Sequence, residues 1–128
     1  MNWAAILAVV AGGGLGALAR HAMAMRVTAW LGSAFPYGIL AVNVTGGFLM
    51  GLLIGMMTTR WPVGETTRLL LTTGFLGGFT TFSTFSLDVV VLIEQKNIGA
   101  AALYIGMSVV VSIAALMAGL WIARHAGT

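Results

Sequence analysis

The side chains of this chain that could do chemistry concentrate in one run, GFLGGFTTFSTFS, which spans Gly74 to Ser86. Glycines, phenylalanines and hydroxyl side chains occur there together, inside a segment that is otherwise apolar. Gly74, Gly77 and Gly78 each cost a helix about 1 kcal/mol relative to alanine, and Thr and Ser offer the backbone competing local hydrogen bonds. The run therefore predicts a broken helix, whose freed carbonyl and N–H groups could contact an ion.

Two phenylalanines follow the predicted break. If the helix resumes there, Phe82 and Phe85 lie on one face at spacing three. The hydroxyls of Thr81 and Ser83 flank them. Packing is the ordinary role of phenylalanine at this spacing. The alternative is anion recognition, because the edge of an aromatic ring is positive and can attract a small anion without trapping it.

Further polar side chains lie outside this run. Asn43 sits in an apolar stretch, where its amide must hydrogen-bond either to protein or to a passing ligand. Tyr104, Ser108 and Ser112 recur at spacing four, which predicts one polar line along a helix. Serines in membrane helices often bond their own i−4 carbonyl, so that role and the lining of an ion path both stay open. Arg20 either extends to the membrane surface or holds a positive vestibule.

Composition identifies the surroundings of these residues. The chain has 128 residues, of which 59% are hydrophobic and 7% charged, and a mean hydropathy of +1.02. Such a chain has too little polar surface for a soluble domain of this size, so its environment should be a lipid bilayer. The basic residues are scattered singly, without the clustered stripe that nucleic acid would require. We therefore expect no nucleic-acid partner.

The elements that must position these residues are membrane-spanning helices. Charged residues divide the chain into uncharged windows, each long enough to cross a hydrocarbon core of roughly 30 Å. They predict helices near 3 to 25, 37 to 59, 67 to 94 and 98 to 123. The expected fold is an all-α membrane protein, a single domain of residues 1–128 whose third helix is broken.

Small residues recur at spacing four in the first two predicted helices. One stripe comprises Ala8, Gly12 and Gly16, and the other Gly47, Gly51 and Gly55. Such stripes let helix backbones approach closely, either within one copy or between copies. The sequence leaves both alternatives open.

The distribution of charge bears on orientation. Four helices place both termini and the 60–68 connector on one side of the membrane. Three basic residues fall on that side, Arg60, Arg68 and Arg124, and three on the other, Arg20, Arg26 and Lys96. This balance gives the positive-inside rule nothing to act on, which predicts dual topology. Oppositely inserted copies could then pair as an antiparallel homodimer.

One motif extends the argument to a family. It comprises Val42-Asn43 and Gly77-Gly78-Phe79-Thr80-Thr81-Phe82-Ser83-Thr84-Phe85-Ser86. The combination closely resembles the CrcB/Fluc family of fluoride channels, and the likeness runs over almost the whole chain. The resemblance implies an antiparallel homodimer in the inner cell membrane, with two pores that pass fluoride out of the cytoplasm.

The resemblance also implies roles for individual residues. Phe82 and Phe85 would face the ion, and Asn43 would donate a hydrogen bond beside them. Tyr104, Ser108 and Ser112 would form a polar track, with Thr81 and Ser83 nearby and Arg20 in a positive vestibule. A structural Na⁺ at the dimer centre would be bound by the backbone carbonyls of Gly77 and Thr80. The chain departs from the family at Asp88, where members commonly carry Glu.

Other function classes fit less well. A small proton-coupled multidrug exporter also has four helices and dual topology, but it needs a carboxylate embedded in the membrane. Residues 1–64 contain no acid, so Asp88 is the only candidate. A structural or assembly factor would leave the polar run unexplained. An enzyme is not expected, because no nucleophile, base and acid group together.

Overall fold

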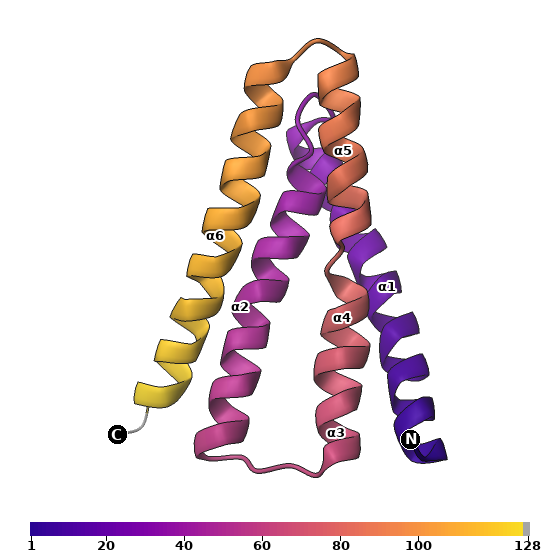
Figure 1. Cartoon of the computed structure of the whole chain (residues 1–128), viewed down its shortest axis with the longest axis vertical. Coiled ribbons are helices and arrows are strands. Elements are labelled where there is room, and N and C mark those ends of the chain that lie inside the picture. Colours follow the sequence, from indigo (N-terminus) through magenta and orange to yellow (C-terminus); the bar gives the residue numbers. More distant parts are fainter. Residues whose placement is uncertain (127–128) are drawn as a thin grey trace.

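The computed structural model describes residues 1–126, and the described chain folds into helices joined by short connectors (Figure 1). The elements are α1 (Trp3–Leu31), α2 (Tyr37–Thr59), α3 (Glu65–Leu69), the π-helix η1 (Leu70–Leu76), α4 (Gly77–Phe79), α5 (Phe82–Glu94) and α6 (Ile98–His125). By length and composition they supply four candidate membrane spans, the third running from Glu65 to Glu94. The predicted all-α class and four spans are confirmed. The last two residues of the predicted domain lie outside the described part.

The predicted helix boundaries agree with the structure for the second helix, and the first and fourth helices are longer than predicted. The second helix was predicted near 37 to 59, and α2 spans Tyr37–Thr59. The first was predicted to end near residue 25, but α1 continues to Leu31. It ends where Gly32 takes a φ of 88°, a left-handed conformation that favours glycine. The fourth runs two residues further than 123, to His125.

The N-terminus and the end of α6 lie at the same end of the molecule as the connector between α2 and α3 (Figure 1). An even number of spans requires this arrangement. The connectors after α1 and after α5 lie at the opposite end. The described part of the chain therefore has the arrangement of ends and connectors that was assumed when the basic residues on the two sides of the membrane were counted.

The third helix is broken, but its glycines do not break it. Gly74 lies within the π-helix, and Gly77 and Gly78 are helical in α4. The interruption consists of Thr80 and Thr81, whose backbones are extended at φ, ψ of −82°, 157° and −151°, 127°. The broken helix predicted within the run from Gly74 to Ser86 is thus confirmed, and the interruption falls on the two threonines that follow the glycines.

The glycines instead allow the backbone of α1 to approach closely. A Cβ added to Gly78 would lie 2.5 Å from the carbonyl oxygen of Gly13. One added to Gly74 would lie 3.0 Å from the carbonyl oxygen of Ala8. Side chains at these positions would separate the two segments, so packing against α1 outweighs the poor helix propensity of glycine.

The two predicted stripes of small residues pack within one copy. In the first, a Cβ at Gly12 would lie 2.5 Å from the carbonyl oxygen of Leu70 in η1. In the second, a Cβ at Gly47 would lie 2.8 Å from the carbonyl oxygen of Ser112 in α6. Close approach between neighbouring helices of the same chain therefore accounts for both stripes.

Helix α2 contacts both halves of the broken segment. One buried cluster joins it to α5 and α6 and contains Leu40, Phe85, Leu92, Ala101 and Tyr104. A second joins it to η1 and α4 and contains Val42, Leu76 and Phe79. At the far end of α2, the guanidinium of Arg60 donates to the carbonyl of Ala123 in the last turns of α6. The break is thus held between two packed clusters, beside α2.

Candidate ion path at the broken helix

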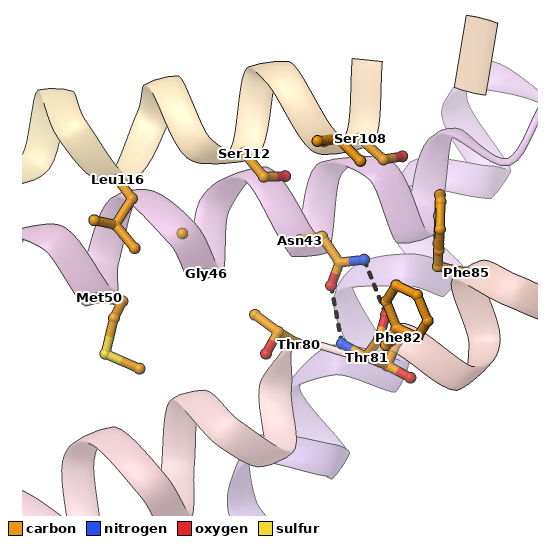
Figure 2. A pocket seen from close by; sticks show the side chains of 12 residues that line it. Asn43, Gly46, Met50, Thr80, Thr81, Phe82, Phe85, Ser108, Ser112 and Leu116 are labelled. Atoms are coloured by element: carbon orange, nitrogen blue, oxygen red, sulfur yellow. Dashed lines mark hydrogen bonds between the residues drawn. The ribbon is translucent and has the colours of Figure 1, made fainter. Parts of the chain in front are cut away.

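Asn43 fixes the break through two hydrogen bonds (Figure 2). Its Nδ2 donates to the carbonyl oxygen of Thr81 at 3.0 Å, and its Oδ1 accepts from the N–H of Thr81 at 2.9 Å. The amide therefore serves the structural role that the sequence left open. Because Nδ2 carries two N–H groups, the second can still serve another acceptor.

Thr81 also begins the next helix. Its Oγ1 accepts from the N–H of Thr84 at 3.2 Å, a capping bond for α5. Helix α5 starts at Phe82, so the positive end of its dipole lies at the break. An anion next to Thr81 would be stabilised by this end of the helix.

A cavity of about 350 Å³ opens beside the break, between α2, the two threonines and α6 (Figure 2). Its twelve lining residues are Asn43, Gly46, Gly47, Met50, Thr80, Thr81, Phe82, Phe85, Ser108, Val109, Ser112 and Leu116. None of them is charged. Polar groups line it near Asn43, and apolar side chains line it near Met50 and Leu116.

Two serine hydroxyls of α6 lie at this cavity. The Oγ atoms of Ser108 and Ser112 are buried, and neither has a hydrogen-bond partner among the described residues. They do not bond their own i−4 carbonyls, so this alternative from the sequence is excluded. A buried hydroxyl without a partner costs about 1–3 kcal/mol, which a ligand in the cavity could recover. Both hydroxyls can therefore donate to an ion.

Tyr104 lies outside the cavity lining. Its ring is fully buried, at 0% exposure, and its centroid lies 5.1 Å from that of Phe85. Its hydroxyl donates to Oδ2 of Asp88 at 2.9 Å. The polar line predicted on α6 is thus divided, with two serines facing the cavity and the tyrosine bonded to an acid. Asp88 gains the partner that its position in the span requires.

The two phenylalanines predicted to share a face have adjacent rings. Their centroids lie 5.4 Å apart with the ring planes 47° from parallel. Phe85 is buried at 8% exposure, whereas Phe82 is 77% exposed in the single chain. Both line the cavity, so one ring is fixed by the core and the other projects from the surface.

The remaining predicted site residues divide into two groups. Thr80 lines the cavity. Ser83 is exposed, with its Oγ 3.3 Å from that of Thr81. Gly77 is exposed on α4, and Arg20 lies half-buried on α1. Unlike Thr80, these three residues, Ser83, Gly77 and Arg20, do not belong to the cavity lining.

Sequence reasoning missed several lining residues. Gly46, Gly47 and Met50 follow Asn43 at three, four and seven positions, the spacing of one helix face. Leu116 continues the series of Ser108 and Ser112 by four. Continuing the helical spacings from Asn43 and Ser112 to the apolar positions on the same faces would have identified these lining residues.

Comparison with known proteins identifies the family. The family described as "CrcB-like protein, Camphor Resistance (CrcB)" matches residues 7–120. A protein of Nitrobacter winogradskyi is 48% identical over 124 residues, covering 97% of this chain and 98% of the relative. One of Rhodospirillum centenum is 50% identical over 121 residues, covering 94% and 96%. One of Phenylobacterium zucineum is 51% identical over 122 residues, again covering 94% and 96%. This chain belongs to the CrcB family.

The three CrcB relatives all bear the name fluoride-specific ion channel FluC. The matched range, 7–120, includes the break and all the residues of the cavity. The resemblance inferred from the motif around Phe82 and Phe85 is confirmed. Since these relatives are named as channels, the expectation that the chain is not an enzyme also agrees with its family.

Proposed function

We propose that this chain forms a fluoride-selective channel of the cell membrane. The observation that carries the proposal is the uncharged cavity at the break, which gathers hydrogen-bond donors and aromatic rings in one place. The names of relatives that match nearly the whole chain support fluoride as the ion.

The chemistry of the cavity favours an anion over a cation. The hydroxyls of Ser108 and Ser112 have no partner within residues 1–126, and Asn43 retains one N–H group. The positive end of α5 and the ring edges of Phe82 and Phe85 add attraction without a formal charge. Such contacts bind weakly enough for an ion to leave again, as conduction requires.

The assembly we propose is an antiparallel, dual-topology homodimer with two pores, which exports fluoride from the cytoplasm across the inner membrane. The equal division of basic residues between the two sides supports both insertions. Phe82 supports a partner as well, because its ring lies next to the cavity but is 77% exposed in the single chain. In the dimer, Arg20 would contribute the positive vestibule.

We also propose a structural Na⁺ bound by the carbonyls of Gly77 and Thr80. In an unbroken helix these carbonyls would accept from the N–H groups of Thr81 and Thr84. The first N–H donates to Asn43 and the second to the Thr81 hydroxyl, so the backbone here fits a cation that prefers oxygen ligands. If Na⁺ is bound, the unfolding temperature of the purified protein should rise with Na⁺ concentration at constant ionic strength. An unfolding temperature independent of Na⁺ would exclude the site.

A proton-coupled exporter is less well supported. Such a pump needs a carboxylate in its binding chamber, and no acid lines the cavity. Of the three acids in the broken span, Glu65 and Glu94 lie at its two ends. Asp88, the one between them, bonds to Tyr104 instead.

The test is anion efflux from liposomes that contain the purified protein. Liposomes loaded with fluoride should empty rapidly once valinomycin balances the charge, whereas those loaded with chloride should retain it. Phe85→Ile keeps a bulky apolar side chain but removes the ring edge, so its fluoride efflux should be strongly reduced. Equal efflux of the two anions from the unmodified protein would refute the proposed selectivity.

A further inference from the structure

Gly46 lies on α2 one turn after Asn43 and faces the break. It is buried, and it lines the cavity together with Thr80 (Figure 2). A Cβ added to Gly46 would overlap the Cγ2 methyl of Thr80, and it would lie 3.2 Å from Cδ2 of the Phe79 ring. The first extended residue of the break therefore occupies the space that a side chain at position 46 would fill.

Thr80 is not free to turn its methyl group away. Its Oγ1 donates to the carbonyl oxygen of Leu76 at 3.0 Å, and its branched side chain has few allowed χ1 rotamers. A different rotamer would give up this hydrogen bond in a part-buried site. A side chain at Gly46 would therefore displace the backbone of the break. The next residue along it is Thr81, the one held by Asn43.

We propose that Gly46 is a positioning residue for the ion path. Its missing side chain lets the methyl of Thr80 pack against α2, and this packing brings the backbone of Thr81 within hydrogen-bonding distance of Asn43. Asn43 acts by hydrogen bonds, and Gly46 acts by leaving space. The role differs from that of Gly51 and Gly55, whose faces contact α6 and not the break.

The inference rests on the proposed channel function, and fluoride efflux provides its first test. Gly46→Ala should lower efflux by about tenfold or more, because it overpacks the site that holds Thr81. Thr80→Ser removes only the methyl that the new side chain would overlap and keeps the hydroxyl. In the Thr80→Ser background, Gly46→Ala should therefore change efflux by less than about twofold.

A matched control separates this effect from any general effect on efflux of replacing a helical glycine with alanine. Gly106 lies within α6, and outside its own helical turn a Cβ added there would have no atom of the described chain within 4 Å. Gly106→Ala should leave efflux unchanged. A loss equal to that of Gly46→Ala would overturn the inference, since it would show that contact with Thr80 is not the cause.

The second readout does not depend on fluoride. The N–H of Thr81 is bonded to Asn43, so its hydrogen exchange, followed by NMR in detergent micelles, reports that contact. Gly46→Ala should accelerate this exchange, and adding Thr80→Ser should slow it again. If the unmodified protein carried no fluoride, the proposed function would fail while the exchange measurement still tested the role of Gly46.

Besides a loss of efflux in Gly106→Ala, three results would overturn the inference. In the first, Gly46→Ala shows normal efflux and normal exchange. In the second, Gly46→Ala lowers efflux but leaves the exchange at Thr81 unchanged. In the third, the double variant Gly46→Ala with Thr80→Ser is as impaired as Gly46→Ala alone.

Discussion

Asn43 binds the backbone of Thr81 with both ends of its amide, so a single side chain determines where the third span is interrupted. The same contact leaves the Gly77 carbonyl without its helical donor. Ser108 and Ser112 act differently, because their buried hydroxyls bond nothing in the described chain. At the residue scale, one group of side chains shapes the break, and another would be available to an ion in the proposed path.

Replacing Asn43 tests the first group. Asn43→Leu removes two hydrogen bonds, each worth about 0.5–1.5 kcal/mol net, so fluoride efflux should fall by about tenfold or more. Thr58→Val on the same helix is the control, because the Thr58 hydroxyl bonds only carbonyls of its own helix. The expected result is loss of efflux with unchanged elution in size-exclusion chromatography. Normal efflux from Asn43→Leu would remove Asn43 from the path.

Replacing the serines tests the second group. Ser108→Ala and Ser112→Ala should each reduce efflux severalfold, yet leave thermal stability equal or higher, because each removes a buried hydroxyl without a protein partner. Ser86→Ala is the control, since that hydroxyl bonds the carbonyl of Phe82. Reduced stability with normal efflux would show that the two serines are structural.

At the scale of elements, the π-helix and α4 pack closely on α1, and the extended threonines follow directly. Poor helix propensity and the competing hydrogen bonds of Thr and Ser predicted a break within the run from Gly74 to Ser86, but not which residues of the run leave the helix. Propensity describes a residue alone, whereas Gly78 is helical because the backbone of Gly13 lies against it. Asn43, thirty-eight positions before Thr81, fixes the interruption. The limits of α2 were predictable because they depend on local signals. The two residues at which the third span is interrupted were not, because they depend on a contact with a residue distant in the sequence.

Gly78→Ala tests this account of the glycines. Although alanine favours helix, a Cβ there would lie 2.5 Å from the Gly13 carbonyl oxygen, so the change should destabilise the fold by about 1–3 kcal/mol. Gly14→Ala should be neutral or stabilising, because outside its own helical turn its Cβ would have no atom of residues 1–126 within 4 Å. Thermal unfolding of both variants in detergent distinguishes them. A stabilised Gly78→Ala would restore the idea that this glycine only weakens the helix.

At the scale of the whole molecule, the proposed antiparallel pairing depends on the balanced charge, which allows both insertions, and on the exposed Phe82 ring beside the cavity, which a partner could cover. The family and the four spans were predictable from composition and one motif. The pairing of Asp88 with Tyr104 was not, because spacing along one helix does not reveal contacts with another.

Dual topology can be measured directly, because the chain has no native cysteine. Gly64→Cys places a thiol in the exposed connector after α2, where an added Cβ would have no described residue within 4 Å apart from its chain neighbours. A membrane-impermeant maleimide added to intact cells should label about half of the copies. Labelling of all copies, or of none, would show a single orientation and refute the antiparallel dimer.

The most direct test of the central claim is the reversal potential of the purified protein in a planar bilayer, with a fluoride gradient imposed against equal chloride on both sides. A fluoride channel predicts current that reverses at the fluoride equilibrium potential and does not shift when a pH gradient is added. A reversal potential that follows the pH gradient, or one that follows chloride when chloride is varied, would contradict the account.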